Sequence, residues 1–397
     1  MSAPRFLLLA ALGLFSLAGV IFLFGTDAGR RDAQVGAKAL PFFPKGKLPA
    51  LGNAAAEGSN VAQSEQLRAL ERHVRRLFDF ASPSERLELM RLLQTIGGHG
   101  SDAIPVLKAA LAHTDQDVRR AAMRGFAATQ SQAAIPVLQN YLNDNIAIEE
   151  STEAALALAT MDNPSVTPLL QGALEQSKDT VLREHIVDAL VSRPPSEVDL
   201  FVDSFLARPD VAPEEKQNLL RMSGLNNTKP AEFLTAQIQN PNESLRMGAY
   251  QGLALVSESR QTPALMPRVA AEKDPFDRAL VYEALGNQTD ANTRALGSLA
   301  DAETDGYARL RALKAWTESA GRENLPLAGD SASPIRVAEL QAAALSHPDF
   351  AERRVALFAL GFARRDSVVR PAIEHIAQES TSEKIRGLAA GLLGDSN

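Results

Sequence analysis

Arginine is the residue type with the clearest chemical potential in this sequence, because a guanidinium binds carboxylates and phosphates bidentately. One arginine recurs at nearly constant spacing, as in the stretch DQDVRRAAMRGFAAT (residues 115–129). The recurring places, called reference positions below, are Arg86, Arg119, Ser151, Arg183, Lys216, Arg246, Arg278, Arg309, Arg353 and Arg386. Successive steps are 30 to 33 residues, apart from one step of 44. This regularity predicts a repeated structural contact rather than ten active sites, although one or two of these arginines could also hold a ligand.

Other patterns with catalytic meaning are weak. The six histidines are scattered, and none forms the H-E-x-x-H spacing of a zinc site. The sequence has neither a G-x-S-x-G elbow nor a phosphate-binding G-x-x-x-x-G-K-[ST] loop. There is no cysteine to supply a thiolate nucleophile or a sulfur ligand. The acid pairs Glu149-Glu150 and Glu214-Glu215 lie where helices are expected to begin and complement the helix dipole there. We therefore expect no metal, no cofactor and no enzyme activity.

The elements that carry the reference positions are helices. Around Arg119, the residues Val118, Ala122, Gly125 and Phe126 form an apolar stripe at helical spacing. Residues that favour helix N-caps stand four places before most reference positions, and these are Ser82, Asp115, Asp179, Asn242, Asp274, Asp305, Asp349 and Ser382. A shorter apolar pattern such as AIPVLKAAL (residues 103–111) precedes each capped helix. The sequence thus predicts an all-α fold, an α-solenoid of about ten two-helix units that bury their apolar faces against one another.

The signature D-x-x-V/L/I-R-x-x-A-x-x-A-L resembles that of HEAT-like repeats, particularly the short bacterial type found in phycobilisome lyases. It is visible in DQDVRRAAMRGF, KDTVLREHIVDAL and ESLRMGAYQGL, and the resemblance covers about residues 83–394. Tetratricopeptide repeats have a similar length, but their Trp, Gly-Tyr and Pro spacing is missing. The resemblance implies a ladder in which arginine pairs with an acid of an adjacent turn. It would be formed by Arg86, Arg119, Arg183, Arg246, Arg278, Arg309, Arg353 and Arg386.

The N-terminal part has a different organisation. A tail (residues 1–5) precedes a transmembrane helix or signal anchor (residues 6–25), whose segment Phe6–Phe24 has no charge and is long enough to span a bilayer. A cleaved signal peptide and a soluble apolar helix are the alternatives. A flexible linker (residues 26–62) follows, and its stretch LPFFPKGKLP (residues 40–49) either packs on the first helix or docks on a partner. The HEAT-like α-solenoid would occupy residues 63–397, with an inserted loop near 319–334.

A protein-binding surface is expected where the second helices of the units face outward. The candidate residues are Arg120, Arg124, Met247, Tyr250, Tyr282, Arg354 and Phe358. Exposed aromatic residues and arginines are typical of binding hot spots. The alternative is that Tyr250, Tyr282 and Phe358 complete the packing between units. Trp316, the single tryptophan, falls on the apolar stripe and is expected in the core.

The expected function is that of a membrane-anchored, non-catalytic scaffold or adaptor for envelope or membrane proteins. With a formal charge of −7, no nucleic-acid partner is expected. It would lie in a bacterial inner membrane with a single span, through residues 6–24. The count of lysines and arginines favours a cytoplasmic solenoid. An export-type N-terminus favours a periplasmic one, which we expect. The alternatives are a bilin lyase or isomerase, which the resemblance permits, and a nucleic-acid binder of the DNA glycosylase type.

Overall fold

The computed structural model describes residues 58–80, 82–256 and 259–394. Every regular element of these residues is helical, so the expected all-α class is confirmed. The first five helix pairs are α3 (Gly58–Arg76) with α4 (Pro83–Gly97), α5 (Ile104–Leu111) with α6 (Gln116–Ala128), α7 (Ile135–Gln139) with α8 (Ile148–Ala159), α9 (Val166–Gln176) with α10 (Thr180–Val191), and α11 (Pro195–Ala207) with α12 (Pro213–Leu225). The others are α13 (Ala231–Gln237) with α14 (Glu243–Leu253), α15 (Thr262–Ala271) with α16 (Pro275–Gly286), α17 (Thr293–Ala302) with α18 (Gly306–Glu323), α19 (Ser333–Ser346) with α20 (Phe350–Phe362), and α21 (Arg370–Glu379) with α22 (Glu383–Gly394). The second helix of every pair carries one reference position.

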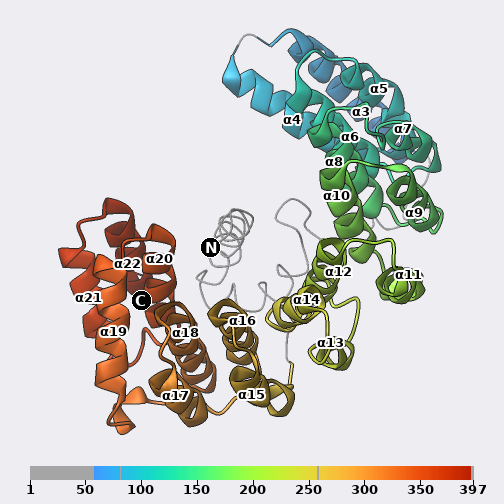
Figure 1. Cartoon of the computed structure of the whole chain (residues 1–397). Helices are drawn as coiled ribbons and strands as arrows, with labels where there is room; N and C mark the ends of the chain where they lie inside the picture. The colour runs from blue at the N-terminus through green and yellow to red at the C-terminus, as the bar shows by residue number, and fades with distance from the viewer. Residues whose placement is uncertain (1–57, 81, 257–258, 395–397) are drawn as a thin grey trace. The chain divides into compact units, whose positions relative to one another are not determined.

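The described residues divide into two compact parts at Met222, within α12, and each part is considered by itself. In the N-terminal part, α4, α6, α8 and α10 pack on one another in chain order. In the C-terminal part, α14, α16, α18, α20 and α22 do the same. Figure 1 shows that the first helices of the pairs form a second row beside them in each part. Within each part, these pairs therefore bury their apolar faces against neighbouring pairs, as the repeat pattern predicts.

Side-chain caps begin most of the second helices. The Asp115 carboxylate accepts hydrogen bonds from the backbone N–H groups of Asp117 (2.8 Å) and Val118 (3.2 Å) at the start of α6. Equivalent caps are made by Ser82, Asp179, Asn242, Asp274, Asp305, Asp349 and Ser382. Helix α8 follows Ala147 without a side-chain cap, and Glu149 and Glu150 stand in its first turn instead. These residues fix where each second helix begins, and hence where its reference position lies.

Small residues allow the second helices to approach closely. A Cβ atom on Gly97 of α4 would lie 2.2 Å from the carbonyl oxygen of Gly125 in α6. In the C-terminal part, a Cβ atom on Gly224 would lie 2.2 Å from the carbonyl oxygen of Gly252. Larger side chains fill the rest of the core, and Trp316 is only 1% exposed, as expected. This close packing explains the use of glycine and alanine on the inner faces of the helices.

The segment expected as an inserted loop (residues 319–334) is partly helical, so that expectation is wrong at its start. Helix α18 continues to Glu323 and ends at Asn324, whose φ of 50° is left-handed. Two hydrogen bonds hold the C-terminal end of α18 in place. Ser319 Oγ donates to the Ala291 carbonyl (3.2 Å), and Arg322 Nη1 donates to the Gln288 carbonyl (2.7 Å). The connection to α19 is therefore short and contains only a 3-10 turn, Leu327–Gly329.

The expected boundaries at the N-terminal end are only partly covered. Helix α3 begins at Gly58, five residues before the expected start of the solenoid at residue 63. The tail, the apolar segment and the linker up to residue 57 lie outside the described residues. Among the helices that the structure describes, none combines the length and apolar character needed to cross a bilayer.

Candidate protein-binding surface

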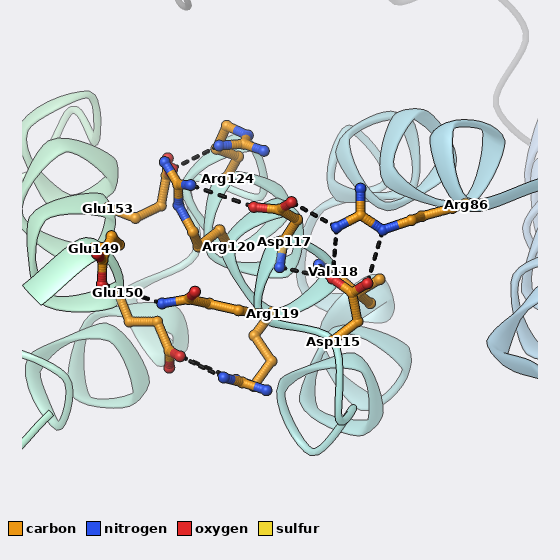
Figure 2. A network of polar contacts seen from close by, with 11 residues as sticks. Arg86, Asp115, Asp117, Val118, Arg119, Arg120, Arg124, Glu149, Glu150 and Glu153 are labelled. Carbon is orange, nitrogen blue, oxygen red and sulfur yellow. Dashed lines mark hydrogen bonds and ion pairs between the residues drawn. The ribbon is translucent and has the colours of Figure 1, made fainter. Parts of the chain in front are cut away.

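Six of the reference arginines connect one unit to the next. Arg119 donates from Nη2 to Glu150 Oε1 (2.5 Å) at the start of α8, as Figure 2 shows. Its Nη1 donates to the carbonyl oxygens of His113 and Thr114 (2.8 Å each), in the turn before α6. The Arg119 guanidinium therefore satisfies backbone carbonyl groups in the turn of its own unit and also binds an acid of the following unit.

The same link recurs in both parts of the chain, and we call the set the arginine ladder. Its pairs after Arg119 are Arg183 with Glu215 (2.5 Å), Arg246 with Glu272 (3.3 Å), Arg278 with Glu303 (2.9 Å) and Arg309 with Glu339 (2.6 Å). Arg86 is the exception that uses an N-cap acid, Asp115, at 2.7 Å. Arg353 donates to the carbonyl oxygen of His347, and Arg386 donates to that of Ser380 (2.5 Å). Apart from Arg86, the acid is thus a glutamate of the next unit and not the capping aspartate of the adjacent turn.

Two tyrosines expected on the binding surface belong to this ladder. Tyr250 is 0% exposed and donates to Glu272 Oε1 (2.7 Å), while Tyr282 is 1% exposed and donates to Glu303 Oε2 (3.2 Å). Burial raises the pKa of both phenols. The expectation that they face a partner is wrong, because the following unit covers the helix position four residues after the reference arginine. They complete the packing between units, which was the alternative interpretation.

The other expected binding residues lie in separate places. Phe358 is only 7% exposed, with the Arg354 guanidinium carbon 5.8 Å from its ring centroid, and Met247 is half-buried. These residues belong to the C-terminal part, whereas Arg120 and Arg124 belong to the N-terminal part. Neither part of the chain therefore holds all of the expected residues.

Arg120 and Arg124 form a second line of contacts between units. Arg124 Nη1 lies 2.6 Å from Glu153 Oε2 in α8, and Arg120 Nε lies 3.3 Å from the same oxygen (Figure 2). The Glu153 side chain is only 6% exposed. This contact joins the residue five places after one reference position to the residue two places after the following reference position. It recurs between Asp188 and Asn218 (3.0 Å) and between Glu283 and Arg311 (3.4 Å).

Asp188 of α10 provides a pH test of this second line. Burial raises its pKa to about 6, against the attraction of Arg221 and with a contribution from Glu184. The folded pKa of Asp188 exceeds the unfolded value of about 3.9. The contribution of this side chain to the free energy of unfolding is therefore complete below pH 4 and is lost as the pH rises through 6. We expect Asp188→Asn, which keeps an acceptor for Asn218, to stabilise the protein by about 1 kcal/mol at pH 7.5 and by nothing at pH 4. Urea unfolding at both pH values measures this, and an effect independent of pH would contradict it.

A charged cluster joins three units of the C-terminal part, and we did not predict it. Lys314 Nζ of α18 lies 2.5 Å from Glu283 of α16 and 3.1 Å from Glu318. Arg311 pairs with Glu283 and, in a short contact, with Glu352 of α20. Although burial opposes it, the charges of Lys314 and Arg311 lower the pKa of Glu283. Residues of opposite charge thus pair across α16, α18 and α20, and the cluster links three units.

A groove between α9 and α11 is lined by four apolar residues and by Gln171, Glu175, Ser204 and Arg208. It has a volume of about 340 Å³. Leu174 of α9 and Phe205 of α11 are buried among its lining residues, and the Phe201 ring lies tilted by 45° with its centroid 5.3 Å from that of Phe205. Leu200, which also lines it, is 83% exposed. We will call this feature the α9–α11 groove.

A sequence signal for the groove exists in α11 and was overlooked. Val198, Val202 and Phe205 form the apolar stripe that the core buries. Phe201 stands three residues after Val198 and four before Phe205, so it borders this stripe, whereas Leu200 falls outside it on the exposed side of the helix. Leu200 is therefore the one large apolar side chain of α11 that the core leaves exposed.

The fold and these contacts define the protein as an all-helical repeat protein, and comparison with known proteins agrees. A model of HEAT repeats matches residues 74–151 and 104–191, so the predicted resemblance is confirmed and residues 74–191 are HEAT repeats. No curated protein sequence matches the chain.

Solved structures with a similar helical arrangement include human deoxyhypusine hydroxylase in complex with glycerol, at 19% identity and a TM-score of 0.31, covering 78% of this chain and 99% of that one. The complex of CpcE and CpcF of phycocyanin lyase from a Nostoc species is similar at 18% identity and a TM-score of 0.31, covering 56% and 92%. The UNC-45 chaperone, described as binding and folding muscle myosin, matches at 16% identity and a TM-score of 0.29, covering 86% and 44%. These proteins have different activities, and we take none of them for this chain.

Proposed function

We propose that this protein is a non-catalytic scaffold or adaptor that binds another protein through the surface of its helical repeats. The observation that carries the proposal is the α9–α11 groove, where Leu200 is 83% exposed beside Phe201. Burying an exposed leucine in an interface is favourable by about 1.5–3 kcal/mol, so such a residue is a natural anchor. Contacts between units already account for most of the arginines. This supports the proposal indirectly, because it gives those arginines a structural role.

We also propose that the apolar segment at residues 6–24 anchors the protein in a bacterial inner membrane, with the repeats in the periplasm. The support is its uncharged composition and its length, which suits a bilayer core. A C-terminal alkaline phosphatase fusion tests the orientation, since that reporter is active only outside the cytoplasm. Activity that depends on residues 6–24 is the expected result. Activity of a fluorescent protein fused at the same place, without phosphatase activity, would place the repeats in the cytoplasm.

Affinity capture from detergent-solubilised membranes tests the scaffold function. The bait is the full chain, compared with the variants Leu200→Ser and Ile335→Ser. Ile335 is a matched control because it is 69% exposed on α19 and is not one of the residues that line the groove. We expect the native chain to recover a partner protein, Leu200→Ser to recover at least about ten-fold less, and Ile335→Ser to behave as the native chain. Recovery of no partner would contradict the proposal, and so would a tetrapyrrole absorbance band gained on titration, which would favour the lyase alternative.

A further inference from the structure

Arg354 of α20 differs from the other arginines that were expected on a binding surface. Arg120 and Arg124 are both paired with Glu153, whereas the Arg354 side chain forms no ion pair or hydrogen bond within the described part of the chain. It is half-buried, and its Nε atom is fully buried. The Phe358 ring lies beside it, with 5.8 Å between the guanidinium carbon and the ring centroid. Burial alone lowers the pKa of Arg354, because no described carboxylate offsets it.

In the other units, a following unit supplies the acid. The acids that bind a reference arginine or the arginine after it come from six positions of the following unit, represented by Glu339, Glu303, Asp115, Asp117, Glu150 and Glu153. Counted from the reference position of that unit, they stand 14, 6, 4, 2 and 1 places before it and 2 places after it. The register of the repeat therefore predicts where an acid for Arg353 and Arg354 would have to stand.

The last unit, formed by α21 and α22, has no acid at any of these positions. The corresponding residues, counted from Arg386, are Ala372, Ser380, Ser382, Lys384, Ile385 and Leu388. Within α20, Glu352 is already paired with Arg311. The Arg353 side chain binds only the carbonyl oxygen of His347 among the described residues. Two adjacent arginines of α20 are thus left without a carboxylate by the part of the chain that the structure describes.

We infer that Arg353 and Arg354 bind the carboxylates of an acidic segment of a partner protein. Carboxylates satisfy the same two register positions in α6, where Arg119 pairs with Glu150 and Arg120 with Glu153. A half-buried guanidinium without a counter-charge is unfavourable in the free protein, and a bound carboxylate removes this cost. This inference rests on the proposed scaffold function and specifies the chemistry of the partner.

An acidic protein segment fits this site better than a nucleic acid does. The chain as a whole carries a formal charge of −7, so it repels a polyanion at long range. A short acidic segment needs only the local contact with the two guanidinium groups. The affinity of such a contact should fall as salt is added.

Thermal unfolding separates a binding role of Arg354 from a structural one. Arg354→Met removes an unpaired charge and keeps an apolar stem beside Phe358, so the unfolding midpoint of the full chain should stay within about 2 °C of the native value or rise. Arg278→Met, which removes a ladder arginine, should lower the corresponding midpoint by more than about 6 °C. A similar loss for both variants would show that Arg354 holds the fold together, and would overturn the inference.

Fluorescence anisotropy with two labelled peptides tests the binding itself. The probe is a 15-residue peptide that carries four glutamates in two adjacent pairs, and its counterpart has glutamine at each of them. The protein is the full chain, either native or carrying Arg354→Gln or Arg370→Gln. Arg370 is the matched control because its variant loses the same charge from an exposed place in the same part of the chain.

We expect the acidic peptide to bind at least about ten-fold more tightly than its glutamine counterpart. Arg354→Gln should weaken the acidic peptide about ten-fold, whereas Arg370→Gln should leave its affinity within about two-fold. No binding, equal binding of the two peptides, or equal losses in the two variants would overturn the inference.

Other occupants give distinct results, each of which would also overturn it. Tighter binding of the acidic peptide after Asp395→Asn would show that an acid of the chain itself, outside the described residues, fills the site. A dimer that Arg354→Gln dissolves, measured by sedimentation, would show that a second copy fills it. Capture of a partner that is insensitive to Arg354→Gln would leave the scaffold function standing and remove only this site, whereas failure to capture any partner would remove the function itself.

Discussion

Replacing Gly97 with alanine is expected to destabilise the N-terminal part of the protein by about 3 kcal/mol or more, a large effect for a single methyl group. The new Cβ atom would lie 2.2 Å from the Gly125 carbonyl oxygen and 2.9 Å from the Ala128 Cβ atom. Neither atom belongs to a flexible side chain, so α4 and α6 would have to separate. Thermal unfolding followed by circular dichroism should show the corresponding transition lowered by roughly 6–12 °C.

Gly172→Ala is the matched control for this change. Gly172 lies in the middle of α9, and nothing comes within 4 Å of a Cβ atom built there. Since alanine favours a helix over glycine by about 1 kcal/mol, this variant should be slightly more stable than the native protein. If Gly97→Ala and Gly172→Ala changed the stability in the same direction, the second helices would not be in direct backbone contact.

Replacing Arg278 with methionine is expected to cost about 3–5 kcal/mol, because it leaves a buried carboxylate without its counter-charge. Glu303 is 4% exposed in its side chain and accepts from Arg278 Nε (2.9 Å) and Nη2 (3.0 Å). Methionine retains the apolar stem but not the charge. Chemical unfolding of the variant measures the loss.

The matched control is Arg370→Met, which removes an arginine from the exposed pair with Glu374, whose side chains are 47% and 45% exposed. Exposed pairs of this kind contribute little, so the change should be within about 0.5 kcal/mol of neutral. Adding Glu303→Gln to Arg278→Met should recover about 2 kcal/mol, because the uncompensated charge is then removed. Equal costs for Arg278→Met and Arg370→Met would show that the arginine ladder does not hold the units together.

The pH dependence provides an independent check on Glu303. Its hydrogen bonds with Arg278 lower its folded pKa below the usual value. A depressed carboxylate pKa stabilises the folded state above the unfolded pKa, and this contribution is lost as the pH falls through the folded pKa. The difference between the native protein and Arg278→Met should therefore be greatest near pH 7 and should shrink below about pH 4.

The repeating features of this protein were predictable because they depend on local chemistry. The N-caps at Asp115 and Asp274 follow from side chains that satisfy the first backbone N–H groups of their own helices. The helix pairs follow from apolar spacing, and Trp316 was placed in the core by the same spacing. The arginines were recognised as repeated contacts because their period matches that of the helices.

The contacts between units were less predictable, because they depend on how far one helix pair extends over the next. Tyr250 and Tyr282 occupy outward positions on their own helices, and only the neighbouring unit buries them. Their acceptors, Glu272 and Glu303, are the C-cap residues of α15 and α17. The sequence had instead suggested that the arginines pair with the aspartates that cap the second helices. The α9–α11 groove depends on the separation of two helices, which a single leucine outside the apolar stripe of α11 does not determine.

Photo-crosslinking from position 200 in living cells tests the central functional claim most directly. A photoreactive amino acid at residue 200 should form a covalent product with one partner protein. The same amino acid at residue 335, which is equally accessible but outside the groove, should not form this product. Absence of the product at residue 200, or the same product from both positions, would contradict the assignment of the α9–α11 groove as the partner-binding surface.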